Sequence, residues 1–384
     1  MPSAPPLTPP LRAEVDLRAL RYNARALRRR AEGATLVAVV KADAYGHGAL
    51  PVVRALLEEG VERFAVAGVA EGIALREGGV EAPLLVMMAP LPEMLPAYAR
   101  YNLAATVATR EGAEAVASAA RRGGPLTVHV KVDTGLHRLG LAPADVPGVL
   151  RLLQGAPGVA VEGLWTHFAT ADEPDLDFAY EQLALFDALV HAVDPPPLLH
   201  LANSGGLLQI PEAVEGRALV RVGGALYGLP ASRILEMEAP EVRPVMRLVT
   251  RVLQVKTVER GETVSYGRTW TASGPTRIAT LAVGYGDGYP RSLSNRGHVA
   301  VRGRLYPIAG RVCMDLTMLD LGPPDGPGGA VRVGDEAVLF GSGGPSALDV
   351  AEWADTISYA LTCGLTARVP RVYVGAENGG GAPA

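Results

Sequence analysis

Over the first 240 residues, short aliphatic runs alternate with longer stretches in which apolar residues recur at helical spacing. The longer stretches, such as Leu50–Glu59, Arg110–Arg122 and Asp175–Val193, predict amphipathic helices. The aliphatic runs are rich in β-branched residues and predict strands that are buried on both faces. The predicted strands are Leu36–Val40, Phe64–Val69, Leu84–Met88, Leu103–Ala108, Leu126–Val132, Val159–Trp165, Leu198–Ala202 and Ala218–Val222.

The spacing of these strands favours one architecture. Successive strands begin roughly 26 residues apart, which is the repeat of a βα unit in a parallel sheet. Eight such units fit a closed (β/α)8 TIM-like barrel better than an open, doubly wound sheet. No glycine-rich dinucleotide fingerprint follows the first strand, which weakens the doubly wound alternative. We therefore predict an α/β fold in which an N-terminal barrel spans residues 11–240.

The pattern changes after residue 240, where β-like runs are separated by clusters of glycine and proline. The run pattern predicts a mainly β C-terminal domain over residues 241–376, with a helix at Ala347–Thr356. Residues 1–10 and 377–384 are predicted to be loose termini. The predicted strands of this domain are Val245–Val258, Arg277–Val283, His298–Val301, Leu305–Ile308, Val312–Leu319, Ala337–Phe340 and Val369–Val374.

The composition argues against several classes of partner. The formal net charge is −4, so no basic surface is expected to bind nucleic acid or an anionic membrane. No apolar run reaches the length of a bilayer span, and the first residues lack the regions of a signal peptide. The two cysteines, Cys313 and Cys363, are too few for a disulfide framework. We expect a cytoplasmic protein with no membrane partner and no metal site.

Lysine is scarce in this chain. Of 36 Lys plus Arg residues only Lys41, Lys131 and Lys256 are lysines. A coding bias toward arginine explains the surface, but a lysine retained in such a chain is a candidate for amine chemistry that guanidinium cannot perform.

Polar residues gather where the predicted strands end, which is where (β/α)8 barrels hold their active sites. One lysine or histidine at such a position is more often a solvated strand end or a structural residue. Ser204 with Gly223 and Gly224, however, fits a phosphate site of the kind found after the last barrel strands. A phosphate site near the strand-end Lys41 suggests pyridoxal phosphate held as a Schiff base. The rim residues are Lys41, Lys131, Arg138, His167, His200, Asn203, Ser204, Arg221, Gly223 and Gly224.

Residues 38–48, Ala-Val-Val-Lys-Ala-Asp-Ala-Tyr-Gly-His-Gly, resemble the cofactor-attachment signature of the alanine racemase family. The resemblance continues in order along nearly the whole chain. Its further matches are residues 131–135, 138–140, 166–168, 202–204, 221–223, 227–228, 264–267, 284–288, 312–315 and 357–359. Small departures fall at Gly286, where alanine is common, and at His137, where a small residue is common.

The resemblance implies that Lys41 carries pyridoxal 5′-phosphate and serves as one of two bases. The second base is Tyr266 of the partner subunit in a homodimer. A tyrosine hydroxyl ordinarily titrates at a pH of about 10, so it needs cationic neighbours to act near neutrality. By resemblance, His167 and Arg221 supply that environment. Arg221 would face the ring nitrogen, whereas amino-acid decarboxylases of the same fold place an acidic group there.

The resemblance also assigns the remaining contacts. Arg138 would contact the ring hydroxyl and the substrate carboxylate, and Tyr285 with Met314 would limit the substrate entrance. Lys131 is either carbamylated, as in some members of the family, or a plain ammonium paired with Asp133. The cofactor-binding set is completed by Tyr45, Asn203, Ser204, Gly223, Gly224 and Tyr359.

We therefore expect a homodimeric, pyridoxal-phosphate-dependent isomerase that supplies D-alanine for peptidoglycan. Two alternatives remain at this point. One is a racemase of broader substrate range, for example for serine. The other is a pyridoxal-phosphate carrier without catalysis, although such relatives resemble only the barrel and lack the β domain that holds Tyr266.

Overall fold

The computed structural model describes residues 9–31, 33–239 and 241–375. The predicted loose termini lie outside these residues except for residues 9 and 10, which are exposed. The described chain forms two units, of which one is Leu20–Arg243 and the other combines the residues up to Ala19 with those from Pro244 onward.

In the described part of the Leu20–Arg243 unit, eight parallel strands follow one another in the order β8-β7-β6-β5-β4-β3-β2-β9. At the remaining seam, between β8 and β9, the Arg221 amide donates to the Ala202 carbonyl at 3.0 Å, so the sheet is nearly closed into a barrel. The predicted barrel is confirmed. The strands are β2 (Thr35–Val39), β3 (Arg63–Val66), β4 (Leu84–Val86), β5 (Ala104–Val107), β6 (Leu126–Lys131), β7 (Val159–Trp165), β8 (Leu198–His200) and β9 (Leu219–Val222).

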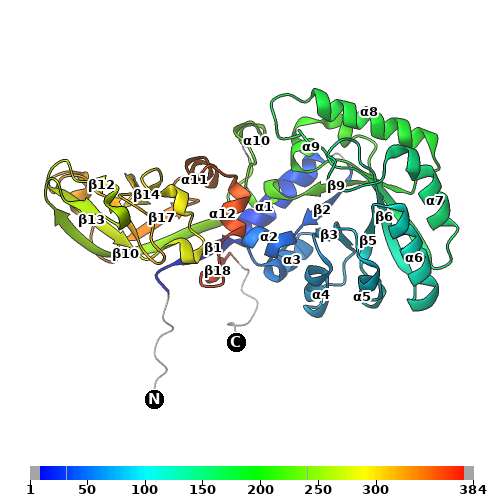
Figure 1. Ribbon diagram of the computed structural model, residues 1–384, viewed down its shortest axis with the longest axis horizontal. Coiled ribbons are helices and arrows are strands. Elements are labelled where there is room, and N and C mark those ends of the chain that lie inside the picture. Colours follow the sequence, from blue (N-terminus) through cyan, green and yellow to red (C-terminus); the bar gives the residue numbers. More distant parts are fainter. Residues whose placement is uncertain (1–8, 32, 240, 376–384) are drawn as a thin grey trace, which may run out of the picture. The chain divides into compact units, whose positions relative to one another are not determined.

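Helices cover the outside of these strands (Figure 1). Helix α6 shows why they form: the Thr109 hydroxyl caps the Gly112 amide at 2.9 Å, and arginines lie in the last turn, where they complement the helix dipole. Its buried residues recur at helical spacing and form one apolar face. The helices are α1 (Leu17–Arg30), α2 (Lys41–Gly46), α3 (Ala49–Glu58), α4 (Val69–Glu77), α5 (Leu95–Arg100), α6 (Arg110–Gly123), α7 (Val146–Gln154), α8 (Asp177–Ala192), α9 (Ser204–Gln209) and α10 (Arg233–Glu238).

The second unit is mainly β, as predicted. Its long strand β10 pairs with β1, β13 and β17, and so organises the main sheet. The strands are β1 (Arg12–Asp16), β10 (Met246–Val258), β11 (Thr263–Val264), β12 (Trp270–Thr271), β13 (Thr276–Leu281), β14 (His298–Val301), β15 (Arg304–Pro307), β16 (Thr317–Asp320), β17 (Glu336–Phe340) and β18 (Arg371–Val374). The helices are α11 (Ala347–Ala354) and α12 (Ser358–Cys363).

Two details differ from the sequence analysis. The sequence predicts residues 11–19 as part of the barrel, but strand β1 pairs antiparallel with β10 and parallel with β18. The strand has only five residues, and both of its partners lie more than 200 residues later, so local pattern does not reveal its sheet. The predicted strand Val312–Leu319 shortens to β16 because the Cys313 amide bonds to the Leu316 carbonyl at 2.9 Å and forms a turn.

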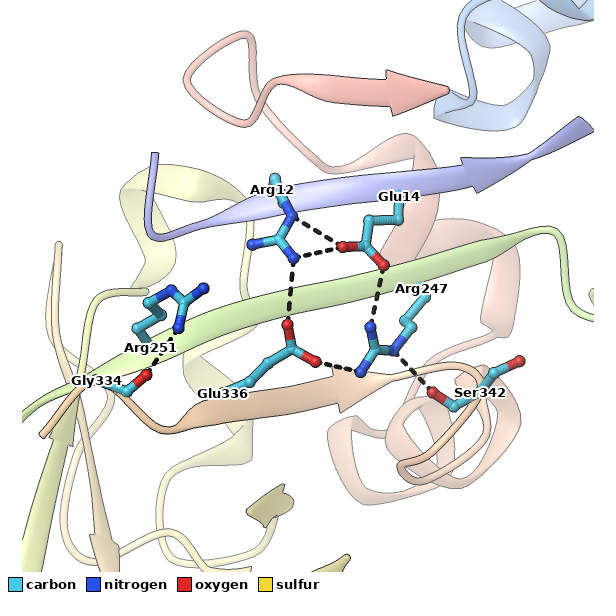
Figure 2. Close-up of polar contacts among 7 residues, drawn as sticks. All are labelled: Arg12, Glu14, Arg247, Arg251, Gly334, Glu336 and Ser342. Atoms are coloured by element: carbon cyan, nitrogen blue, oxygen red, sulfur yellow. Dashed lines mark hydrogen bonds and ion pairs between the residues drawn. The ribbon is translucent and has the colours of Figure 1, made fainter. Parts of the chain in front are cut away.

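Alternating charges cross one face of β1, β10 and β17 (Figure 2). Arg12 donates to Glu14 at 2.8 Å and to Glu336 at 3.2 Å, and Arg247 donates to Glu14 at 3.0 Å and also to Glu336. Burial alone would raise the pKa of Glu336, but the hydrogen bonds and charges of Arg247 and Arg12 outweigh burial and lower that pKa. Glu336 therefore links both arginines across three strands.

We expect Glu336→Gln to lower the free energy of unfolding by roughly 1 kcal/mol at low salt and neutral pH, since both arginines lose a charged partner. A lowered folded-state pKa stabilises above the unfolded-state value, so the deficit should vanish as pH falls below about 4. It should also shrink in about 1 M salt. Thermal unfolding midpoints would measure these effects, with Asp325→Asn on an exposed loop of the same unit as control. A deficit that does not respond to salt would contradict this account.

Candidate active site

Lys41 follows the end of strand β2 with only Val40 between them, and it begins an unusual turn. Residues 42–45 all have positive φ angles, between 51° and 55°, so the lysine begins a left-handed turn built without glycine. Each such residue costs about 1–2 kcal/mol relative to a right-handed conformation. The surrounding structure must therefore hold this turn in place.

The carboxylate of Glu71 holds the turn from outside. Its Oε1 accepts the Ala42 amide at 2.6 Å, and its Oε2 accepts the amides of Ala67 at 2.7 Å and Gly68 at 3.1 Å. Within the turn, the Asp43 carboxylate accepts the Ala49 amide at 2.7 Å. Glu71 thus ties the loop after β3 to the residue that follows Lys41.

Aromatic contacts place Tyr45 beside the end of strand β9. The Tyr45 and Tyr227 rings lie 5.0 Å apart, and the Tyr227 hydroxyl donates to the Val39 carbonyl at 3.0 Å. A Cβ at Gly223 would lie 2.4 Å from the Tyr45 hydroxyl oxygen, so only glycine lets the two segments approach this closely. Gly223 therefore belongs to the cradle that the sequence predicted after β9.

The polar residues after β8 complete this cradle. The Ser204 hydroxyl oxygen accepts the amides of Gly223 at 3.0 Å and Ala225 at 3.4 Å, which leaves its O–H able to donate to an anion. The Asn203 side chain accepts the Gly206 amide at 2.9 Å and caps α9. The Ser204 hydroxyl, oriented by the Gly223 and Ala225 amides, can thus donate to a phosphate, while Asn203 orders the segment that presents it.

Arg221 is buried in the barrel, with 2% of its surface exposed. Its Nη atoms donate to the carbonyls of Thr166, His200 and Leu201, at 2.8–3.0 Å, and to imidazole nitrogens of His200 and His167. Its Nε is buried and finds no partner among the described residues. An unpaired donor on a buried cation fits an acceptor supplied by a bound group.

The structure corrects one expectation about charge. Burial, followed by the charge of Arg221, holds the pKa of His167 well below its usual value, so this imidazole is neutral at physiological pH. Burial lowers the pKa of Arg221 to about 9, which leaves the guanidinium charged. Of the two residues expected to form a cationic environment, only Arg221 carries a charge.

Lys131 is 4% exposed, and its Nζ lies 4.5 Å from the centre of the Trp165 ring. Burial, followed by the charges of Arg138 and Arg221, lowers the pKa of Lys131 to about 8. The Asp133 carboxylate instead accepts the amides of Gly135 and His137, both at 3.0 Å. No ion pair joins Asp133 to Lys131 in the described part of the chain.

The C-terminal unit presents Tyr266 on its surface, with 72% exposure. Ser265 and Gly267 on either side have φ angles of 69° and 72°, so the tyrosine projects from a sharp turn. The Ser265 hydroxyl donates to the Arg311 carbonyl at 2.6 Å and holds that turn.

Tyr285 and Met314 come from neighbouring segments of the same unit. The Tyr285 amide donates to the Cys313 carbonyl at 3.0 Å, and the Gly286 amide donates to the Met314 carbonyl at 2.8 Å. Both side chains are exposed, by 41% and 53%. Tyr359 lies half-buried on α12.

Sequence reasoning missed Glu71, although a signal was present. Gly68 and Glu71 stand at the cap and third positions of α4, the spacing at which a carboxylate bonds backward to backbone amides. It also missed His129 and Glu162, which extend the contacts of His200 through the barrel. No pattern in the strands marks those two residues as partners.

Two sequence profiles divide the chain as the structure does. The family described as "Alanine racemase, N-terminal domain" matches residues 15–231, and "Alanine racemase, C-terminal domain" matches residues 245–373. The chain belongs to the alanine racemase family.

Individual members of the alanine racemase family match over nearly their full length. The alanine racemase of Halothermothrix orenii is 42% identical over 377 residues, covering 96% of this chain and 97% of its own. That of Symbiobacterium thermophilum is 44% identical, covering 95% and 97%. The crystal structure of alanine racemase from D-cycloserine-producing Streptomyces lavendulae is similar with a TM-score of 0.89 at 37% identity, covering 97% and 98%. That from Streptomyces coelicolor A3(2) has a TM-score of 0.88 at 40% identity, covering 95% and 98%.

Across the described residues, no helix combines the length and apolar character needed to cross a bilayer.

We expect Glu71→Gln to loosen the Lys41 turn, because an amide cannot accept with both of its terminal atoms as the carboxylate does. Losing one or two of these bonds at a partly buried carboxylate costs about 1–3 kcal/mol, so exchange of the Ala42 amide should accelerate about 10- to 100-fold. Hydrogen exchange measured by mass spectrometry or NMR would test this. Glu77→Gln at the end of the same helix is the control. Equal protection of Ala42 in all three proteins would show that Glu71 does not hold the turn.

Proposed function

We propose that the protein interconverts L- and D-alanine with pyridoxal 5′-phosphate bound at the barrel mouth. The observation that carries the proposal is the pairing of neighbouring strands: Lys41 follows β2, and the Gly223 cradle follows β9, which is its parallel neighbour. The candidate amine and the candidate phosphate site thus follow adjacent strands, which supports binding of one cofactor by both. Family membership supports the same activity.

The residues present fit the cofactor. Ser204, Gly223 and Gly224, with Tyr45 and Tyr359, would hold the phosphate, with Asn203 ordering the loop. The unpaired Nε of Arg221 would donate to the ring nitrogen. When bound, the cofactor withdraws electrons from the substrate's Cα and so makes its hydrogen acidic.

Racemisation removes a proton from one face of Cα and returns one to the other. In this proposal the Lys41 Nζ serves one face, and the hydroxyl of Tyr266 of the partner subunit serves the opposite face. Two fixed groups avoid moving a single base across the substrate. His167, which is neutral, would contribute a hydrogen bond, and Arg221 would contribute the positive charge.

Arg221 also favours racemisation over transamination. A guanidinium only donates hydrogen bonds, so Arg221 would favour an unprotonated ring nitrogen and would make the bound cofactor a weaker electron sink. A weaker electron sink would favour return of the proton to Cα over transamination. This is the chemical difference from the decarboxylases of the same fold, which present a carboxylate.

The substrate would be held by Arg138 at its carboxylate, while Tyr285 and Met314 restrict its side chain. We place the enzyme in the cytoplasm, where D-alanine would supply peptidoglycan; Cys313 and Cys363 are not joined in a disulfide. Racemisation assays with alanine, serine and lysine test the proposal. Alanine should be preferred, whereas equal rates on serine would indicate the broader racemase, and no turnover would indicate a carrier.

The exposure of Tyr266 supports an active site shared between two copies of the chain, and mixing two variants tests it. Lys41→Ala and Tyr266→Phe homodimers should each be nearly inactive in at least one direction. A heterodimer combines one doubly altered site with one intact site. Since random mixing makes about half of the dimers heterodimers, activity should recover to roughly a quarter of the wild-type value. Verified heterodimers without recovery would mean that Tyr266 does not act across the interface.

We further propose that Lys131 is carbamylated. The Lys131 ammonium first loses a proton. The neutral amine then attacks CO2, forming an N–C bond as one C=O π bond opens, and a second proton is released. A cation whose pKa is lowered by burial and by the charges of Arg138 and Arg221 thus becomes an anion. Relative to an ordinary lysine, a pKa of about 8 raises the reactive fraction roughly 300-fold at neutral pH. Loading should therefore rise as pH increases toward 8.

A carbon-13 carbamate resonance from labelled bicarbonate would measure this loading. The resonance should appear in the wild-type protein and in the control Lys256→Arg, and it should be missing from Lys131→Ala. A resonance that persists in Lys131→Ala would locate the carbamate elsewhere, and its absence from the wild type would exclude it.

A further inference from the structure

A chain of polar side chains runs through the interior of the barrel unit from Arg221. Arg221 Nη1 lies 2.7 Å from His200 Nδ1, and His200 Nε2 lies 2.9 Å from His129 Nδ1. His129 Nε2 lies 3.1 Å from Glu162 Oε2, and Arg63 donates to Glu162 Oε1 at 3.0 Å. We call Arg221, His200, His129 and Glu162 the barrel relay.

The chemistry of the groups fixes the direction of every bond in the barrel relay. A guanidinium can only donate, so His200 must accept at Nδ1. Burial, followed by the charge of Arg221, holds the pKa of His200 well below its usual value, so its single ring proton lies on Nε2. The His200 Nε2–H donates a hydrogen bond to His129 Nδ1. His129 Nδ1 therefore carries no proton, and the ring proton of His129 lies on Nε2. The Glu162 carboxylate accepts a hydrogen bond from this Nε2–H. Each hydrogen bond of the barrel relay is therefore donated in the direction from Arg221 toward Glu162.

An irregularity in the backbone of β7 orients the Glu162 side chain. Val161 pairs with Val128 but Gly163 pairs with His129, so Glu162 is the extra residue of a β-bulge. Bulges redirect side chains. A Cβ on Gly163 would lie 2.1 Å from His129 Nδ1, so glycine leaves the space that the imidazole occupies.

Glu162 lies toward the opposite end of the barrel from Lys41. It lines a pocket together with Arg63, Leu84, Ala104 and Leu219, which are the first residues of β3, β4, β5 and β9. The hydrogen bond from His129 is the largest influence on Glu162, and with Arg63 it outweighs burial and lowers the pKa to about 2. Glu162 is therefore an ionised acceptor at the far end of the barrel relay.

The ionised Glu162 carboxylate acts on Arg221 only through the two histidines between them. Among the described residues its hydrogen-bond partners are carbonyls and imidazoles, and none is a carboxylate. Without Glu162, neither arrangement of the ring protons would pair every group. In one arrangement the His129 Nε2–H would lose its acceptor, and in the reversed one the His200 Nδ1–H would face the Arg221 N–H, so both tautomers would be populated. That conflict would move the guanidinium whose Nε is directed to the cofactor ring in the proposed function.

We propose that Glu162 is a positioning residue that fixes the tautomers of His129 and His200, and thereby holds Arg221 in the orientation that keeps the enzyme a racemase. The assignment of the tautomers depends only on contacts within the protein and needs neither the cofactor nor the proposed activity. The reaction-specificity part rests on the proposed function.

Nitrogen-15 NMR of histidine-labelled, cofactor-free protein reads the tautomers directly. In the wild type, His129 and His200 should both carry the proton on Nε2. Glu162→Gln should keep this state, because the amide oxygen can still accept from His129 while Arg63, 25% exposed, turns to solvent. Glu162→Leu should give mixed tautomers at both histidines. Asp187→Leu is the matched control, since it removes a similarly exposed carboxylate paired with Arg217 in the same unit.

In the cofactor-loaded enzyme, the ratio of transamination to racemisation should rise roughly tenfold in Glu162→Leu, at the lower end of losses seen when orienting outer residues are removed. The ratio should return close to the wild-type value in Glu162→Gln and stay unchanged in Asp187→Leu. A general loss of stability would lower both reactions together and leave their ratio unchanged.

A proton on Nδ1 of either histidine in the wild type would overturn the proposal, and this measurement stands even if Glu162→Leu does not fold. Unchanged tautomers in Glu162→Leu, or changed tautomers with an unchanged reaction ratio, would also overturn it. Absence of racemisation in the wild type would instead refute the proposed function, and the tautomer measurement would remain valid.

Discussion

One buried guanidinium, which bonds to no carboxylate among the described residues, governs the interior of the barrel unit. Arg221 has three carbonyls and two imidazoles around its Nη atoms, and the Trp165 ring lies 4.7 Å from its Cζ. These groups solvate the charge without neutralising it locally, so Arg221 remains a donor. The neutrality of His167 and His200 and the lowered pKa of Lys131 all follow in part from this charge.

The strained turn after β2 fixes the position of the Lys41 backbone. A lysine at the end of an ordinary strand would have a long, freely rotating side chain, whereas the left-handed turn fixes the backbone from which Lys41 departs. The energy of that turn is offset by bonds from Glu71 and Asp43 to backbone amides. Rigid placement of the amine therefore depends on carboxylates that need not touch a substrate.

Much of the fold could be predicted because it repeats. Eight aliphatic runs at regular spacing defined the barrel strands to within a few residues, and glycine-rich turns separated the strands of the second unit. The sheet to which strand β1 belongs was not predicted, because the partners of β1 are distant in sequence. For the candidate site, strand ends and a family resemblance predicted Lys41, Arg221 and Ser204, which the structure places at or near the ends of barrel strands. Glu71, His129 and Glu162 could not be found in this way, because a capping carboxylate and a bulge depend on three-dimensional pairing.

The bulge in β7 also determines which way the strand faces. Side chains alternate between the two sides of a strand, so one extra residue reverses the alternation from that point onward. Deleting Glu162 would restore regular pairing, but it would place either Val159–Val161 or Gly163–Trp165 on the wrong side of the barrel wall. The orientation of the strand that leads to His167 therefore depends on the length of β7 as well as on the identities of Glu162 and Gly163.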